Sequence, residues 1–199
     1  MSYMAKQASE GKRAHSDKVF IGVIGMDEHG PKEPIPPHAY AIAEEIGKLV
    51  AQRGAILISG GRGGIMESAS KGAFLAGGLT VGILPSSDKA EANPYVTVPI
   101  ASGLNEVRSH AVIGASDVLI MVCGSTGTLN EVTFAYGYRP LIVVEGTGGW
   151  ADMLRPAIYE GRFLDQRGSA EIVYVKTAQE AVDKAFELAG TMPPKREWK

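Results

Sequence analysis

Short apolar runs alternate with amphipathic stretches along most of the chain. The apolar runs are nearly continuous, which is typical of strands covered on both faces of a sheet. They predict strands at Val19–Gly25, Ala55–Ser59, Thr80–Leu84, Tyr95–Ile100, Val118–Val122, Leu141–Glu145 and Ile172–Val175. Most of these runs are separated by a single amphipathic stretch.

The stretches between the runs carry apolar residues at helical spacing. They predict helices at His38–Arg53, Ile65–Leu75, Leu104–Ala115, Leu129–Tyr136, Trp150–Tyr159 and Ala178–Leu188. Gly54 follows the first helix as a stop signal, and the proline-rich segment Gly30–Pro37 is expected to be a loop. Strands that alternate with helices form parallel sheets through right-handed crossovers. We therefore expect an α/β fold: a doubly wound, Rossmann-like parallel sheet with helices on both faces.

The length of 199 residues favours one domain. Residues 1–18 are polar and predict a flexible arm, and residues 19–190 hold all the predicted elements. Residues 191–199 predict a short tail whose Trp198 docks on the domain. The arm has no apolar segment of a secretory signal. A cytoplasmic protein is the expectation.

Composition removes several functional classes. Hydrophobic residues make up 45% and charged residues 21%, and the formal charge is −2, so there is no basic excess for holding nucleic acid. No apolar run reaches the ~20 residues of a membrane span. The single cysteine, Cys123, excludes an internal disulfide, and no spacing of histidines or carboxylates suggests a metal site.

Glycine is in excess, with 25 residues, and it clusters directly after apolar runs. The first cluster comprises Gly60, Gly61, Arg62, Gly63 and Gly64, and it leaves a strand and opens a helix. Glycines there admit positive φ and a close ligand, and the helix start offers free N–H groups to an anion. The spacing matches neither the dinucleotide fingerprint nor a P-loop. A tight strand-to-helix turn explains this cluster equally well.

A second cluster follows the run Val118–Val122 and again opens a helix. Its members are Gly124, Ser125, Thr126, Gly127 and Thr128, and Thr128 is a candidate helix cap. Strand ends of a parallel sheet share one edge, where ligands of this fold bind. Both clusters, with Gly25 at the end of the first strand, are therefore expected to hold one phosphate or nucleotide. Two such helix starts favour a binding site over turn chemistry alone.

Two side chains are candidates for chemistry beside this phosphate site. Arg108 is expected in the middle of its helix, and Glu131 in the first turn of the helix after the second cluster. A guanidinium presents a planar fork of donors to phosphate, and a carboxylate can stabilise an oxocarbenium-like transition state or activate water. Ordinary surface positions remain the alternative for both.

These motifs resemble the LOG (Lonely Guy) family, also labelled lysine decarboxylase-like. Residues 60–66 match its glycine-rich segment, Arg108 the arginine of M-H-x-R-K, and Gly124, Gly127, Thr128 and Glu131 its P-G-G-x-G-T-x-x-E. The stretch from 58 to 85 is closer still to the molybdenum cofactor carrier branch. Departures replace the motif residues at five positions: Cys123, Ser125, Ser109, Glu106 and Asn130.

The resemblance implies a phosphoribohydrolase that cleaves the N-glycosidic bond of nucleoside 5'-monophosphates, with Arg108 and Glu131 as the catalytic pair. It also implies a homodimer or higher homo-oligomer with the site near the subunit interface. No cofactor is required; the expected ligand is a nucleotide, phosphate or molybdenum cofactor. The alternative is a binding or carrier protein that uses the same loops without catalysis. An NAD-dependent oxidoreductase is disfavoured, because Gly22–Met26 leads into a proline-rich loop without the third fingerprint glycine.

Overall fold

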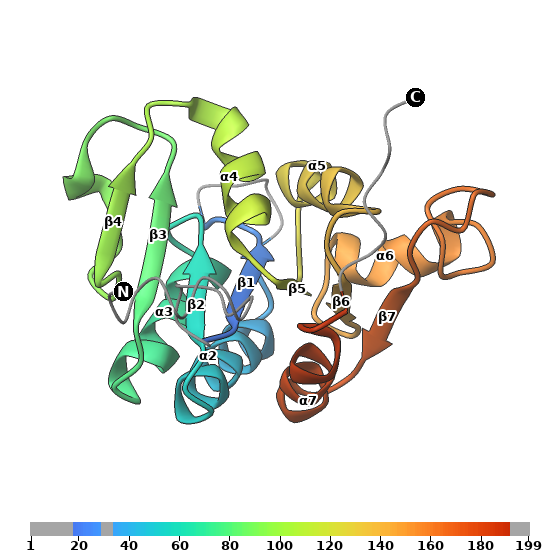
Figure 1. Cartoon of the computed structure of the whole chain (residues 1–199), viewed down its shortest axis with the longest axis horizontal. Helices are drawn as coiled ribbons and strands as arrows, with labels where there is room; N and C mark the ends of the chain where they lie inside the picture. Colours follow the sequence, from blue (N-terminus) through green and yellow to red (C-terminus); the bar gives the residue numbers. More distant parts are fainter. Residues whose placement is uncertain (1–17, 29–33, 192–199) are drawn as a thin grey trace, which may run out of the picture.

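The computed structural model describes residues 18–28 and 34–191 (Figure 1). The predicted arm and the docking of Trp198 lie outside these residues, as does part of the proline-rich loop. The next helix begins at Pro37, the first helical position, where a missing N–H costs no hydrogen bond. Gly54, with φ +75°, follows its last turn as predicted.

Seven parallel strands form one sheet. They are β1 (Phe20–Gly25), β2 (Ile56–Ser59), β3 (Thr80–Leu84), β4 (Val98–Ala101), β5 (Val118–Val122), β6 (Leu141–Val144) and β7 (Ile172–Val175). The order is β4-β3-β2-β1-β5-β6-β7, and every neighbouring pair is parallel. The chain builds outward from β1 to β4 and then returns to place β5 on the other side of β1. The order therefore reverses between β1 and β5, which is where this fold opens a crevice.

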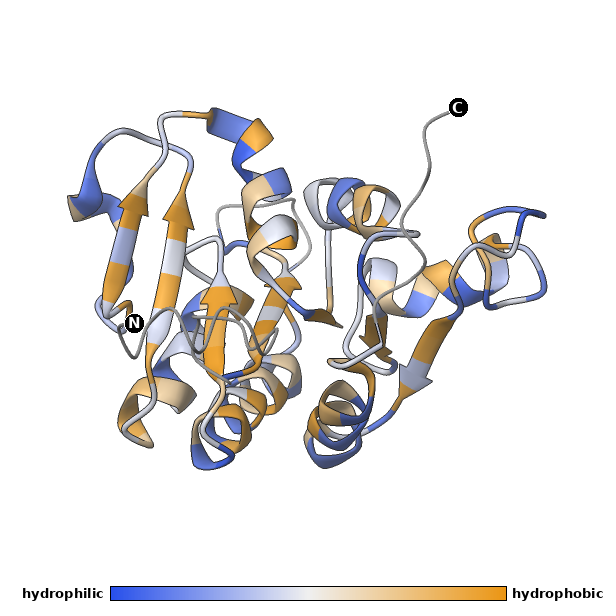
Figure 2. Ribbon diagram, in the orientation of Figure 1, coloured by the Kyte–Doolittle hydropathy of each residue, from blue (hydrophilic) through white to orange (hydrophobic). Residues whose placement is uncertain are grey.

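Helices cover both faces of the sheet. They are α2 (Pro37–Gln52), α3 (Ile65–Leu75), α4 (Arg108–Ala115), α5 (Thr126–Ala135), α6 (Trp150–Ala157) and α7 (Ala178–Leu188). Apolar residues of α2, α3 and α7 pack on one face, and those of α4, α5 and α6 on the other. Figure 2 shows the hydrophobic strands between these two layers. The predicted doubly wound α/β fold is confirmed.

The central strand β5 is buried on both faces, which explains why polar and apolar residues do not alternate in its sequence. Val118, Ile120 and Val122 join the core under α2, α3 and α7, whereas Leu119 and Met121 join the opposite core. Successive strand residues point to opposite faces, so burial on both faces requires an apolar residue at every position.

Three predicted elements have different boundaries. The strand predicted at Tyr95–Ile100 is β4, displaced toward its C-terminal end. The helix predicted at Leu104–Ala115 is divided into a 3₁₀ turn, η2 (Asn105–Val107), and α4, and Asn105 has φ +48°. The helix predicted from Leu129 begins at Thr126. Glycine and threonine are weak helix formers, which hid this first turn from the sequence pattern.

Candidate functional site

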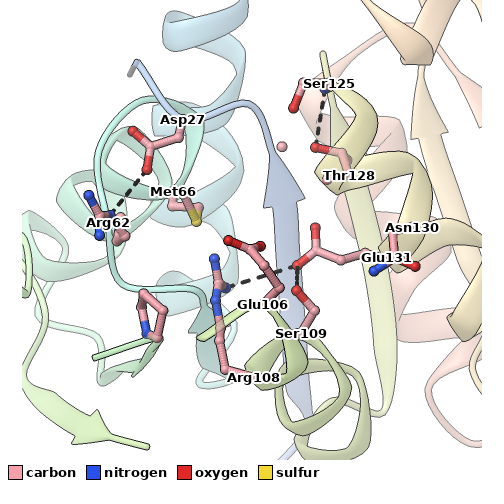
Figure 3. A pocket seen from close by; sticks show the side chains of 13 residues that line it. Asp27, Arg62, Met66, Glu106, Arg108, Ser109, Ser125, Thr128, Asn130 and Glu131 are labelled. Carbon is pink, nitrogen blue, oxygen red and sulfur yellow. Dashed lines mark hydrogen bonds and ion pairs between the residues drawn. The ribbon is translucent and has the colours of Figure 1, made fainter. Parts of the chain in front are cut away.

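A cleft of about 340 Å³ opens beyond the carboxyl ends of the strands, beside the point where the strand order reverses. One wall follows β1 and β2, the other is the beginning of α5, and η2 and α4 contribute the floor (Figure 3). The lining residues are Gly25, Asp27, Arg62, Met66, Pro85, Glu106, Arg108, Ser109, Ser125, Gly127, Thr128, Asn130 and Glu131. Its volume lies at the lower end of the range for small-molecule pockets, roughly 300–1,000 Å³.

The first glycine cluster contributes to the cleft mainly by making room. A Cβ at position 60 would lie 1.8 Å from Nη1 of Arg108 and 2.5 Å from its Cζ. Only a glycine therefore lets the guanidinium rest against the loop after β2. Arg108 itself begins α4, and does not lie in the middle of a helix as predicted.

The other glycines of this cluster face the protein instead of the cleft. A Cβ at Gly61 would meet Leu84 and Gly82 on β3, and one at Gly64 would lie 2.3 Å from the carbonyl oxygen of Met26. Both residues have positive φ, and Gly63 packs against Glu28. These glycines therefore allow the tight turn from β2 to α3, which was the alternative explanation from the sequence.

The beginning of α5 forms the opposite wall. Ser125 precedes the helix, and its N–H donates to the Thr128 hydroxyl at 3.3 Å. The Ser125 side chain accepts in return from the Thr128 N–H, so the two residues form a reciprocal capping box with Ser125 as the N-cap. The sequence pattern instead placed Thr128 at the cap, one residue before the helix. Ser125, Gly127 and Thr128 line the cleft, but Gly124 and Thr126 do not. The capping box engages the N–H groups of Ser125 and Thr128, so an anion at this helix start would be favoured by the N–H groups outside it and by the helix dipole.

The turn before α5 is held by residues 146–149, a segment with three glycines that follows β6. Cys123 takes φ +58°, and its N–H donates to the Thr147 hydroxyl at 2.7 Å. Trp150 N–H donates to the carbonyl of Gly124 at 2.9 Å. Proline cannot adopt a positive φ, so the replacement of the motif proline by Cys123 permits a backbone that the motif excludes.

Glu131 lies in the second turn of α5, not the first, and is 7% exposed, so it is not a surface residue. Its Oε1 accepts a hydrogen bond from the Ser109 hydroxyl at 3.0 Å and lies 4.0 Å from Nη1 of Arg108. Burial raises the pKa of Glu131 to about 7, although Arg108 and the Ser109 hydrogen bond both act to lower it, and Glu106 raises it further.

The Arg108 guanidinium is only partly satisfied. Its Nη1 is buried and has no hydrogen-bond partner within the described part of the chain. A buried N–H group without a partner is costly, typically about 1–3 kcal/mol and more for a charged group. An anionic ligand in the cleft would supply the missing acceptor.

Arg62 connects the loop after β2 to two acidic segments. Its Nε lies 3.3 Å from Oδ2 of Asp27, and its Nη1 lies 3.3 Å from Oε2 of Glu91. Asn93 secures the same loop, because its backbone N–H donates to the Gly61 carbonyl at 2.9 Å and its side-chain amide donates to the Arg62 carbonyl at 2.9 Å. Arg62 therefore reaches the cleft with its charge already balanced.

Of the residues that the sequence singled out, the cleft brings together Gly25, Arg62, Arg108, Ser125, Gly127, Thr128 and Glu131. The remaining ones, Gly60, Gly61, Gly63, Gly64, Gly124 and Thr126, do not line it. Sequence reasoning missed Asp27 and Pro85 as lining residues, and it noted Glu106, Ser109 and Asn130 only as departures from a motif. The sequence position of Asp27 could have indicated its place in the cleft, since it follows the end of β1 by two residues. Pro85 ends β3 and gave no chemical signal.

No group of three or more His, Cys, Asp or Glu residues within ranges 18–28 and 34–191 is arranged to hold a metal ion. Within the same ranges, no helix has both the length and the apolar character that crossing a membrane requires.

Comparison with known proteins agrees with this geometry. Three solved structures are similar along nearly their whole length. TM1055, a structural genomics target, is 36% identical with a TM-score of 0.78, covering 85% of this chain and 99% of its own. The molybdenum cofactor binding protein of Rippkaea orientalis is 30% identical with a TM-score of 0.71, covering 87% and 98%.

The molybdenum cofactor carrier protein of Chlamydomonas reinhardtii is also 30% identical, with a TM-score of 0.68 and coverage of 86% and 98%. The family model described as the SLOG cluster4 family matches residues 18–182. This confirms the resemblance inferred from the glycine motifs. The protein therefore belongs to the SLOG cluster4 family and is related to molybdenum cofactor carrier proteins.

Proposed function

We propose that the protein binds a phosphorylated small molecule, a nucleotide or the molybdenum cofactor, in the cleft and holds it without chemical conversion. The observation that carries this proposal is the buried Nη1 of Arg108, which has no hydrogen-bond partner among the described residues and belongs to the cleft that the start of α5 lines. A phosphate oxygen is the acceptor that both features favour. Two relatives of known structure are described as binding or carrying molybdenum cofactor, which supports the same choice.

The molybdenum cofactor is a phosphorylated pterin, so an anion site is the minimum requirement for holding it as cargo. Gly60 leaves space for the Arg108 guanidinium, and Ser125 and Thr128 add hydroxyl groups at the opposite wall. The residues present therefore fit the phosphate of such a ligand. The cleft supplies no cluster of metal-binding side chains within the described ranges, so the proposed contacts are to the organic part of the cofactor.

A phosphoribohydrolase is the second candidate, because Glu131 and Arg108 are buried side by side at the cleft. Two observations weigh against it. Ser109 stands where the LOG motif has lysine and engages Glu131 Oε1, and a pKa of about 7 leaves this carboxyl partly protonated at neutral pH. A protonated carboxyl neither stabilises a cationic transition state nor accepts a proton from water.

The test combines binding and turnover. We expect AMP, GMP or ribose 5-phosphate to raise the melting temperature of the wild-type protein, with no release of free base from either nucleotide. Gly60→Ala places a methyl group against the Arg108 guanidinium and should weaken binding at least tenfold by calorimetry. A methyl group at Gly114 in α4 meets nothing within 4 Å, so Gly114→Ala is the matched control and should bind as wild type does.

Absence of binding by all three compounds contradicts the proposed binding function. Steady formation of ribose 5-phosphate from AMP or GMP contradicts the non-catalytic reading and favours the hydrolase. We also propose that the chain is a homo-oligomer, as the LOG resemblance implies.

A further inference from the structure

Glu106 differs from the other acidic residues of the cleft. Asp27 pairs with Arg62 at 3.3 Å, and Glu131 has Ser109 and Arg108 beside it. Glu106 forms neither a hydrogen bond nor an ion pair with any residue in the described part of the chain. Figure 3 shows its carboxylate projecting from the floor into the cleft between the two walls.

Glu106 is exposed, so water hydrates its carboxylate when no ligand is bound, but its place beside an anion site bears on which ligand fits. It repels a phosphate and raises the pKa of nearby Glu131, so it disfavours a ligand that is negative throughout. A carboxylate accepts hydrogen bonds but donates none when ionised. It therefore favours a ligand whose far end presents N–H donors.

The floor of the cleft also differs from the LOG motif in charge. Glu106 replaces a histidine and Ser109 replaces a lysine of that motif, so two basic groups are absent and one acid is added. The cleft consequently combines the phosphate-favouring start of α5 on one wall with the Glu106 carboxylate on the floor, where Arg108 also lies. A ligand that matches it is an anion joined to a donor-rich ring.

We propose that Glu106 is the specificity-determining residue of this cleft, and that its two oxygens accept hydrogen bonds from the 2-amino group and the adjacent ring N–H of a 2-amino-4-oxopyrimidine edge. Guanine and pterins both carry this edge. Adenine offers a single amino donor next to a ring acceptor and fits a carboxylate less well. This inference rests on the proposed function, since it assumes that the phosphate of the same ligand occupies the cleft.

The experiment measures by calorimetry the affinity for three nucleotides, GMP, IMP and AMP, and for ribose 5-phosphate, which has no base. IMP lacks the 2-amino group and keeps the ring N–H, so we expect GMP to bind most tightly, IMP next and AMP least. A hydrogen bond to a charged group contributes about tenfold or more in affinity, so GMP should exceed AMP by at least that factor. 6-Hydroxymethylpterin phosphate carries the same edge, and whichever of it and GMP binds more tightly identifies the source of the edge.

Glu106→Gln keeps the shape and leaves only one acceptor. We expect its preference for GMP over AMP to fall to about threefold or less, while ribose 5-phosphate still binds. Glu187→Gln, which changes an exposed acid on α7, is the matched control and should keep the wild-type ranking.

Two outcomes overturn the inference while leaving the proposed function standing. One is equal affinity of the wild-type protein for GMP, IMP and AMP. The other is a Glu106→Gln variant that gains affinity for all compounds equally, since Glu106 would then act by repulsion alone. Failure of ribose 5-phosphate and every nucleotide to bind contradicts the proposed function instead.

Discussion

At the residue scale, the burial of the Glu131 carboxyl lowers the stability of the fold but places the group where chemistry or binding can use it. It is buried on α5 with one hydroxyl donor and one guanidinium nearby, and these two groups do not compensate for its lost hydration. Its pKa is therefore about 7, against an ordinary value of 4.5. Perturbed carboxyls of this kind cluster at functional sites, where they lower the stability of the fold.

The pH dependence of stability follows from this shift. Between pH 4.5 and 7 the folded state binds a proton that the unfolded chain releases, so the free energy of unfolding falls as pH rises through this window. The full effect is about 3 kcal/mol and is reached above pH 7. Glu131→Gln cannot ionise, so it should match wild type at pH 5 and be more stable at pH 8 by up to about that amount.

Urea unfolding at pH 5, 6, 7 and 8 measures the difference between the two proteins. Glu187→Gln removes an exposed carboxylate and should follow the wild-type curve. A constant difference between Glu131→Gln and wild type across this range would show that Glu131 is not the titrating group.

At the scale of the elements, the two helices that cover one side of the first half of the sheet are locked together through glycines. A Cβ at Gly72 of α3 would lie 1.8 Å from the carbonyl oxygen of Glu44 on α2, and one at Gly47 of α2 would lie 1.9 Å from the carbonyl oxygen of Ala69. Each helix therefore approaches the backbone of the other. This packing positions α3, whose first residues follow the glycine-rich loop.

Gly72→Ala tests this packing. Alanine favours a helix by about 1 kcal/mol over glycine, yet the added methyl would overlap backbone that cannot rotate away. We expect a net loss of about 2–3 kcal/mol in the free energy of unfolding, measured by urea denaturation. Gly114→Ala gains the helical preference without the overlap and should be slightly stabilised. A Gly72→Ala protein as stable as Gly114→Ala would refute the close helix contact.

At the scale of the whole molecule, the edge strand β4 and the turn after it leave apolar side chains uncovered. Val98 is 40% exposed, Ile100 44%, Leu104 49% and Val107 58%. An unpaired edge strand with exposed apolar side chains is a site of association between chains. The same turn carries Glu106, so association there would lie beside the cleft.

We expect the purified protein to be a dimer or larger by light scattering at micromolar concentration. Val107→Glu places a charge among these side chains and should shift the protein toward the monomer, because an unpaired charge is costly in an apolar contact. Met153→Glu, at a similarly exposed position on α6, is the control and should leave the mass unchanged. A wild-type monomer would contradict the expected self-association.

Much of the fold was readable from the chain because its signals are local. The apolar runs of β1, β2, β3, β5 and β7 and the stop at Gly54 agree with the structure to within two residues. The start of α5 and the break before α4 were misplaced. The first turn of α5 was hidden because threonine and glycine are weak helix formers, whereas the break before α4 depends on the positive φ of Asn105, which no local pattern predicts.

The sequence alone places both glycine clusters at one edge of the sheet, since a parallel sheet brings its strand ends together there. The pairing of Arg108 with Glu131 was implied by the LOG resemblance and not by this geometry. The tertiary structure was needed to show which of those residues face the cleft, that Glu131 is buried, and that Glu106 has no ion-pair partner among the described residues. Burial and charge balance are set by segments far apart in the chain, and no local pattern records how such segments meet.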